Sequence, residues 1–322
     1  MQRAERSQQA RLGRIRDELL DWFKEHARDL PWRRTRDPYA ILVSEIMLQQ
    51  TQVDRVLPYY TRFLERFPTI EDLANAATSD VIRIWSGLGY NRRAVNLQRA
   101  ARVIVDELGG SFPSDPADLK KLPGIGAYTA GAIAAFAHER DVAFLDTNMR
   151  RVISRVVFGT ESAPESEVLE AANALVPAGQ GWTWNQALIE FGALQCTARR
   201  PACIICPLRD ECAAYPTMQV VLQLKSGRAR PTKAEPFERT TRFYRGRIVE
   251  ALRALPTDDP AGISLAELGP IVREEFTAEN LPWLRELVAG LQRDGLAVLA
   301  EESPSYDVED EAEGSNPRVR LP

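Results

Sequence analysis

The chain has 322 residues, of which 44% are hydrophobic and 27% are charged. No apolar run approaches the ~20 residues that a membrane span needs, and the first fifteen residues lack the apolar stretch of a signal peptide. We therefore expect a cytoplasmic protein with no membrane partner. The net charge of −4 is unevenly distributed. Residues 237–322 carry ten basic and seventeen acidic side chains, whereas residues 1–236 carry 31 basic and 28 acidic side chains. The first two thirds of the chain are thus able to meet nucleic-acid phosphates.

Residues 11–213 are expected to be helical throughout. Apolar side chains recur at spacings of three and four, as in Ile15, Leu19 and Phe23, and almost no segment alternates as a strand does. Turn signals separate the successive helices at Pro31, Pro68, Gly109, Gly110 and Pro113. The pattern predicts an all-α fold for this part of the chain.

Glu45 lies at the centre of the apolar segment ILVSEIML, residues 41–48. A charge in such a setting is costly unless it has a partner or a task. Burial raises the pKa of a carboxyl group, which suits it to donate a proton. We therefore interpret Glu45 as a buried general acid and not as a surface glutamate on a helix.

A glycine-rich turn, LPGIG at residues 122–126, stands directly before an apolar helix. Gly124 and Gly126 allow a tight turn that exposes backbone N–H groups at the helix N-terminus, where they can bind a phosphate without reading sequence. A purely structural turn between helices needs glycine too. Asp146 follows twenty residues after Gly126 and precedes another helix. Taken alone, Asp146 is first of all an N-cap.

All four cysteines of the chain fall within residues 196–212, in the pattern C-x6-C-x2-C-x5-C. Four thiolates so close together suit a tetrahedral zinc ion or a 4Fe-4S cluster. Zinc ribbons usually pair two C-x2-C knuckles, and only one such knuckle is present here. The spacing therefore favours a 4Fe-4S cluster, with the ligands Cys196, Cys203, Cys206 and Cys212.

The last third of the chain divides into a linker and a small domain. Residues 214–236 lose helical periodicity and gather basic side chains, which predicts a basic linker. Residues 237–322 have the order of a winged-helix-like α+β domain, three helices followed by a terminal hairpin. We place the helices at 241–254, 264–274 and 280–294, and the extended stretches at 296–300 and 317–321. Side chains at helical spacing predict one shared core, made of Phe243, Ile248, Leu252, Leu265, Leu268, Ile271, Leu284, Val288 and Leu291.

The cysteine spacing, the LPGIG turn with Asp146 and the segment around Glu45 together resemble the MutY-type adenine DNA glycosylases. This family is the iron-sulfur branch of the helix-hairpin-helix, or endonuclease III, superfamily, and the resemblance covers about residues 11–213. It implies a two-lobed all-α core with a 4Fe-4S cluster. The cluster lobe is expected to comprise 1–35 and 141–213, and the six-helix barrel lobe with the helix-hairpin-helix to comprise 36–140.

The resemblance implies a monomeric enzyme of base excision repair that acts on double-stranded DNA containing a mismatched or damaged base. It would hydrolyse the N-glycosidic bond of a flipped-out base, most simply adenine opposite guanine or 8-oxoguanine. Glu45 matches the glutamate that protonates the departing adenine. Asp146, followed by Asn148, matches the carboxylate that stabilises positive charge at C1′ of the sugar. Tyr128 stands where relatives that also cut the strand carry a lysine, so we expect a monofunctional enzyme that leaves an abasic site.

Further matches concern the base pocket and the DNA surface. Around the flipped-out base, the matching residues are Trp32, Arg33 and Glu190. Gln50 matches a glutamine inserted into the base stack, and Tyr90 matches a tyrosine that wedges beside the opposite base. The complete set expected to contact DNA is Gln49, Gln50, Thr51, Tyr90, Leu122, Gly124 and Gly126.

The chain departs from this family after residue 213. MutY proteins recognise 8-oxoguanine through a C-terminal Nudix-like domain with a Ser-His loop, whereas both histidines here, His26 and His138, lie in the core. Thr147 and Asn91 replace the usual Gly and Tyr. Two other functions stay open: removal of thymine or uracil opposite guanine, and a non-catalytic DNA-binding or redox-sensing regulator. The run Gln49-Gln50-Thr51 favours adenine, and two intact carboxylates argue against a regulator.

The net charge of −7 on residues 237–322 argues against direct binding of DNA phosphates by the tail. The exception would require Arg242, Arg245 and Arg247 to gather on one face. We therefore expect this domain to pack against the glycosylase core or a protein partner, and only secondarily to probe the base opposite the lesion.

Overall fold

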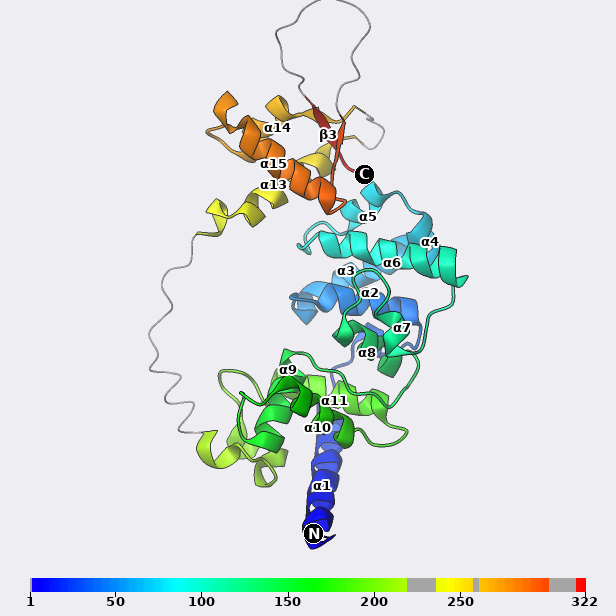
Figure 1. The fold of residues 1–322 in the computed structure, drawn as a ribbon, viewed down its shortest axis with the longest axis vertical. Coiled ribbons are helices and arrows are strands. Elements are labelled where there is room, and N and C mark those ends of the chain that lie inside the picture. The colour runs from blue at the N-terminus through cyan, green and yellow to red at the C-terminus, as the bar shows by residue number, and fades with distance from the viewer. Residues whose placement is uncertain (1, 219–235, 257–260, 301–316) are drawn as a thin grey trace, which may run out of the picture. The chain divides into compact units, whose positions relative to one another are not determined.

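The computed structural model describes residues 2–218, 236–256, 261–300 and 317–322. Its contacts divide the chain into two units, the first made of Met1–Glu45 and Phe112–Arg230 and the second of Ile46–Ser111 and Pro231–Pro322. Helices dominate both units (Figure 1). Among the described helices, none is long and apolar enough to cross a membrane.

The first unit is built around α11, which packs against α1, α8 and α9. Its α-helices are α1 (Gln2–His26), the first part of α2 (Pro38–Leu48), α7 (Pro116–Leu119), α8 (Ala127–Phe136), α9 (Thr147–Ile153), α10 (Glu165–Leu175) and α11 (Gly181–Leu194). Short 3-10 helices are η1 (Pro31–Arg33), η3 (Cys203–Ile205) and η4 (Pro207–Asp210), and a π-helical turn, η2 (Ser154–Phe158), continues α9.

Helix α8 shows how small residues bring the first unit together. Every residue from Thr129 to Phe136 is buried, so the helix is apolar on all sides. At Gly131 an added Cβ would lie 2.5 Å from the Cβ of Phe144. The glycine therefore lets the segment that leads to Asp146 approach the backbone of α8.

The second unit contains four helices from the middle of the chain and the whole C-terminal domain. The middle helices are α3 (Val53–Arg66), α4 (Ile70–Asn75), α5 (Thr78–Ile84) and α6 (Arg92–Leu108). The C-terminal elements are η5 (Phe237–Arg239), α13 (Thr241–Ala254), β1 (Ile263–Ser264), α14 (Leu265–Val272), η6 (Ala278–Asn280), α15 (Leu281–Arg293), β2 (Val298–Ala300) and β3 (Arg318–Arg320).

The three strands form one antiparallel sheet in the order β1-β3-β2. Val319 at the centre of β3 faces Ile263 on one side and Leu299 on the other. The succession of one helix, one strand, two helices and two strands has the order of a winged-helix domain and confirms the predicted small α+β domain. The sequence did not predict β1, because a two-residue strand shows no alternating pattern.

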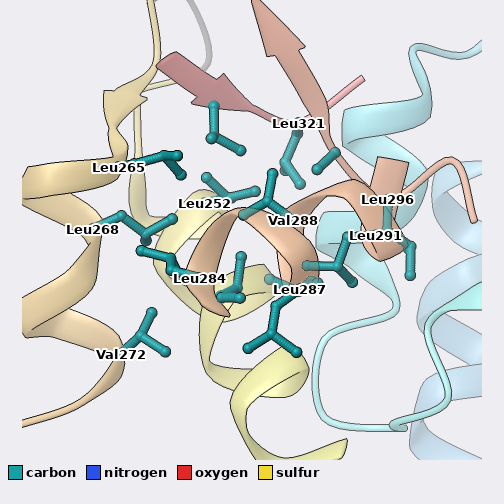
Figure 2. Close-up of a cluster of buried hydrophobic side chains, with 14 of the residues drawn as sticks. Leu252, Leu265, Leu268, Val272, Leu284, Leu287, Val288, Leu291, Leu296 and Leu321 are labelled. Carbon is teal, nitrogen blue, oxygen red and sulfur yellow. The ribbon is translucent and has the colours of Figure 1, made fainter. Parts of the chain in front are cut away.

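The core of the C-terminal domain extends onto the middle helices (Figure 2). Most of the predicted core residues are buried in it, but Ile271 is 48% exposed and Phe243 is only partly buried. Helix α14 turns Leu268 and Val272 inward, which leaves Ile271 on its outer face. Ile82 of α5 and Val95 of α6 belong to the same buried cluster. The domain and these two helices therefore share one hydrophobic core.

The two units differ from the predicted lobes. Residues 112–140 group with the cluster-bearing segment, because α8 packs against α11. The C-terminal domain groups with the middle helices because of the shared core. Most of the predicted linker, residues 214–236, lies outside the described residues, but its first residues, Ala214 and Met218, are buried in the first unit.

Candidate active site and iron-sulfur centre

Glu45 is buried in α2, with 5% of its surface exposed. Burial raises its pKa to about 7, and the negative charge of Asp146 acts in the same direction. A hydrogen bond with Tyr128 and the charge of Arg33 oppose this rise. Within the described part of the chain, Oε2 of Glu45 has no hydrogen-bond partner. A carboxyl group in this state holds a proton near neutral pH and has an oxygen free to deliver it.

Tyr128 in the first turn of α8 makes the hydrogen bond to Glu45. Burial, Glu45 and Asp146 all raise the pKa of the phenol well above its ordinary value, so the hydroxyl stays protonated and donates. Its ring lies edge-on to Phe144, with 5.3 Å between the ring centroids. The tyrosine thereby fixes the orientation of the Glu45 carboxyl group.

Asp146 caps the N-terminus of α9. Its Oδ1 accepts a hydrogen bond from the backbone N–H of Met149 at 2.6 Å, and its Oδ2 accepts one from the side-chain amide of Asn148 at 3.2 Å. Partial burial raises the pKa of Asp146, whereas these hydrogen bonds favour the ionised form. Because the pKa of Glu45 responds to the charge of Asp146, the two carboxyl groups belong to one site.

A chain of hydrogen bonds runs from Asp146 to the cysteine-bearing loop. Asn148 holds Asp146 through its amide N–H and accepts a hydrogen bond from Arg151 at 2.9 Å. Arg151 also donates to the carbonyl oxygens of Gly192 at 2.6 Å and Cys196 at 2.9 Å. One arginine therefore ties the active-site carboxylate to the loop of the metal centre. Sequence reasoning named Asn148 but missed Arg151, because nothing local distinguishes it from neighbouring arginines.

Glu190 is fully buried and paired with two arginines. Arg28 binds both of its oxygens, at 2.7 and 2.9 Å, and Arg33 binds Oε2 at 2.8 Å. Burial alone would raise the pKa of Glu190, but the two guanidinium groups lower it to about 2. Glu190 is thus a permanent anion that holds Arg33, whose Nε also donates to Gln186 at 2.7 Å. Trp32 lies next to Arg33 in the 3-10 helix η1 and is buried as well.

The predicted DNA-facing residues of the second unit lie on two turns that share one arginine. Gln49, Gln50 and Thr51 follow the end of α2, and Tyr90 precedes α6. Arg93 donates to the carbonyl oxygen of Gln49 on one turn, at 2.5 Å, and to that of Gly89 on the other, at 3.2 Å. The structure therefore brings these predicted residues together, through an arginine that the sequence did not reveal.

Gln50 and Tyr90 both adopt positive φ angles, 55° and 48°. Among the described non-glycine residues, Glu139 alone shares this conformation. Such backbone strain is frequent at functional sites and costs about 1 to 3 kcal/mol. Gln50 is exposed and Tyr90 is 39% exposed, so both side chains are available to a ligand.

The LPGIG turn leads into α8 without a side-chain cap. Gly124 has a φ of 76°, and the N-cap residue Gly126 offers no side-chain acceptor to the first N–H groups of the helix. Leu122 and Ile125 are buried and anchor the turn. The helix N-terminus is therefore able to bind an anion such as a phosphate.

The four cysteines line one pocket, and none of them forms a disulfide. Arg155, itself 1% exposed, donates to Sγ of Cys196 at 3.4 Å. Burial raises the pKa of the Cys206 thiol to about 12, and the other cysteines add to this effect. Four thiolates so close together need a compensating positive charge, so the donor set and its arginine neighbour fit a 4Fe-4S cluster.

Comparison with known families supports both sites. Residues 43–178 match the HhH-GPD superfamily of base excision DNA repair proteins, and residues 196–212 match the iron-sulfur binding domain of endonuclease III. The first match contains Glu45, the hairpin and Asp146, and the second begins and ends on a cysteine. The centre is therefore a 4Fe-4S cluster site.

Among solved structures, the chain is similar to a thermostable thymine-DNA glycosylase, with a TM-score of 0.62 and 32% identity over 66% of this chain and 99% of that one. It is also similar to endonuclease III in a trapped covalent complex with DNA, with a TM-score of 0.57 and 25% identity over 63% of this chain and 95% of that one. These similarities confirm the predicted helix-hairpin-helix glycosylase fold.

Curated relatives extend the comparison to the C-terminal domain. The chain is 41% identical to the human adenine DNA glycosylase in an alignment that covers 66% of this chain. The same alignment covers only 41% of the human protein. The chain spans 42% of the mouse protein, at 42% identity over 64% of this chain. The adenine DNA glycosylase of Mycolicibacterium smegmatis is 43% identical over 88% of this chain and 96% of its own length. The chain therefore belongs to the adenine DNA glycosylase family of base excision repair enzymes.

Proposed function

We propose that this enzyme removes adenine from a mismatch with guanine or 8-oxoguanine in double-stranded DNA and leaves an abasic site. The observation that carries the proposal is the buried Glu45, which holds its proton to about pH 7 beside the carboxylate of Asp146. We also propose that the protein acts in the cytoplasm as a monomer.

The proposed reaction begins with a proton from Glu45 to N7 of the flipped-out adenine. The bond between N9 and C1′ then breaks, and its electron pair stays with the base. Positive charge develops at C1′, where the carboxylate of Asp146 stabilises it. A water molecule adds to C1′ and returns a proton to Glu45, so that the acid is restored.

The neighbouring residues support this division of roles. Tyr128 donates to Glu45 and leaves the second carboxyl oxygen of Glu45 free for the base. Asn148 donates a hydrogen bond to Asp146, and Arg151 in turn donates one to Asn148 and so holds its side chain in place. Tyr128 occupies the hairpin position at which a lysine would form a Schiff base, and a phenol cannot do so. The proposal therefore includes base release without strand cleavage.

A second candidate is removal of thymine or uracil opposite guanine. The observation in its favour is the structural similarity to a thymine-DNA glycosylase, at 32% identity. The two carboxyl groups, Glu45 and Asp146, do not distinguish the candidates, because a protonated acid assists the departure of either base. Identity above 40% to adenine DNA glycosylases favours adenine.

A single-turnover assay on four duplexes tests the proposal. Excess enzyme is incubated with each of four duplexes, which contain adenine opposite 8-oxoguanine, adenine opposite guanine, thymine opposite guanine or uracil opposite guanine. Each reaction is then divided into an alkali-treated and an untreated half. We expect rapid release from the two adenine duplexes and strand breaks only after alkali. Faster release of thymine or uracil would overturn the assignment of adenine. Release from none of the duplexes would favour a non-catalytic DNA-binding role instead.

A further inference from the structure

Helix α13 and the turn before α6 form the walls of a groove of about 860 Å³ in the second unit. Aromatic side chains and arginines both line it. The aromatic residues are Tyr90, Phe237 and Phe243, and the arginines are Arg92, Arg93, Arg242, Arg245 and Arg247. We infer, building on the proposed function, that this groove binds the DNA strand that carries the base opposite the excised one, with Arg242 as the residue that positions Tyr90.

Arg242 stacks on Tyr90. Its guanidinium carbon lies 3.9 Å from the centroid of the Tyr90 ring and 5.9 Å from that of Phe237. A cation over an aromatic face is attracted to the ring and holds it in place. Tyr90 already has a strained backbone, and it is the side chain expected beside the opposite base. The C-terminal domain therefore supplies a side chain that fixes the orientation of a DNA-contacting residue of the core.

The groove carries a surplus of positive charge. Its lining contains five arginines but only two carboxylates, Glu250 and Asp294. Asp294 pairs with Arg245 and lies 3.4 Å from Arg92, whose side chain is still 64% exposed. Arg242 is exposed beside them. Phosphates of a strand would therefore meet uncompensated guanidinium groups.

The acidity of the tail does not oppose this assignment. Seven of the seventeen carboxylates of residues 237–322 fall between 301 and 313, and without them the basic and acidic residues are equal in number. One groove is lined by Arg242, Arg245 and Arg247. This is the clustering on one face that we named above as the condition for direct phosphate binding by the tail. The domain does pack against the core helices α5 and α6, as expected. The proposed groove gives it a second role, in binding DNA.

The groove is preformed, because α13 is fixed to the middle helices. Arg253 donates to the carbonyl oxygen of Ile82 at 2.8 and 3.0 Å and to the Asn91 side chain at 2.9 Å. Arg83 donates in return to the carbonyl oxygen of Leu255 at 2.9 Å. Ile82 is also buried in the core of the C-terminal domain. A rigid groove loses little entropy on binding, which favours a built site over an incidental gap.

A lining of arginines together with aromatic rings matches the chemistry of a nucleic-acid strand better than that of an acidic peptide. Guanidinium groups bind phosphates, and exposed rings such as Phe237, which is 53% exposed, can stack on bases. The groove is also lined by Tyr90, the residue expected to lie beside the opposite base. Both arguments identify the occupant as DNA.

Arg242→Ala and Arg285→Ala in the full-length holoenzyme test the inference. Arg285 is exposed on α15 of the same domain and lies outside the groove lining, so the control removes an equal charge. Binding is measured by anisotropy at several salt concentrations, on duplexes with a non-hydrolysable adenine analogue opposite 8-oxoguanine or opposite thymine. We expect Arg242→Ala to weaken binding to the first duplex about tenfold, to reduce the salt slope by about one, and to narrow the preference for 8-oxoguanine. Arg285→Ala should match the wild type.

The outcomes separate the inference from the proposed function. Suppose that Arg242→Ala and Arg285→Ala have equal affinities and salt slopes, and that the wild type releases adenine normally. This result would overturn the assignment of the groove to DNA and leave the proposed function intact. If the wild type releases no adenine, the proposed function fails before the groove is tested. Thermal melts guard against misfolding, and Arg247→Ala provides a second groove variant that should shift affinity in the same direction.

Discussion

Glu45 and Glu190 are both buried carboxyl groups of the first unit, yet their pKa values move in opposite directions. Glu45 has one phenolic partner and a pKa of about 7, whereas Glu190 has two guanidinium partners and a pKa of about 2. The difference assigns them different tasks. Glu45 can give up a proton at neutral pH, and Glu190 can only hold positive charge in place.

Replacing either active-site carboxyl group should stop base release without weakening DNA binding. Glu45→Gln removes the transferable proton, and Asp146→Asn removes the charge that stabilises C1′ while an asparagine still caps α9. We expect single-turnover rates to fall by a factor of ~100 or more. Affinity for a duplex with an uncleavable adenine analogue serves as the control. Near-normal turnover by Glu45→Gln on every duplex would disprove the general-acid role.

The rate of base release should fall as the pH rises through about 7. The pKa of Glu45 is raised above its ordinary value, so the catalytically competent, protonated form dominates below about pH 7 and disappears above it. A pH profile of single-turnover release at subsaturating enzyme measures this. The residual activity of Glu45→Gln should lack the same inflection. A wild-type rate that stays constant from pH 6 to 9 would contradict the assignment.

Helices α8 and α9 each serve two purposes. The N-cap residue of α8, Gly126, makes no side-chain cap hydrogen bond, and the first turn of the helix carries Tyr128. One helix end therefore carries both the expected phosphate contact and the hydrogen-bond partner of Glu45. Helix α9 is capped by Asp146 and carries Arg151, which reaches the carbonyl oxygen of Cys196. The position of each proposed catalytic group thus depends on the packing of a whole helix.

Two glycine substitutions should change stability in opposite directions. Gly131→Ala would place a Cβ 2.5 Å from that of Phe144 and force α8 away from its neighbour, at a cost of about 1 to 3 kcal/mol. Gly13→Ala in α1 meets no atom within 4 Å and should stabilise the protein by about 0.5 to 1 kcal/mol. Thermal or urea unfolding measures both effects. A neutral Gly131→Ala would mean that Phe144 moves aside without cost.

At the scale of the whole molecule, the C-terminal domain is part of the second unit and not an appendage. It buries Ile82 and Val95, and the backbone N–H of Ser79 donates to the last residue, Pro322, at 3.0 Å. The carboxyl groups of the proposed reaction lie in the first unit, whereas Gln50 and Tyr90 lie in the second. The residues proposed to release the base therefore lie in one unit, and those expected to contact the opposite strand lie in the other.

Truncation after residue 236 should destabilise α5 and α6. Exposing Ile82 and Val95 costs about 1.5 to 3 kcal/mol each, and the carbonyl oxygen of Ile82 loses its arginine partner. Hydrogen exchange should accelerate in α5 and α6, while the amides of α11 in the first unit serve as the control. Unchanged protection of α5 and α6 would show that the domain is an independent module.

Much of the site could be predicted because its signals are local. The cysteine spacing, the LPGIG turn and a glutamate inside an apolar helix are each confined to fewer than twenty residues, and short-range geometry determines what they form. The amphipathic periodicity of residues 241–254 predicted α13 to its last residue for the same reason.

Long-range contacts were decided by the tertiary structure alone. Glu190 meets Arg28 across a separation of 162 residues, and Arg253 meets Asn91 across the same distance in sequence. No pattern in a single sequence records such pairs, because many arginines are available and only packing selects one. The stacking of Arg242 on Tyr90 is of this kind. The local sequence determined the chemistry that each segment offers, and the packing of distant segments determined which groups act together.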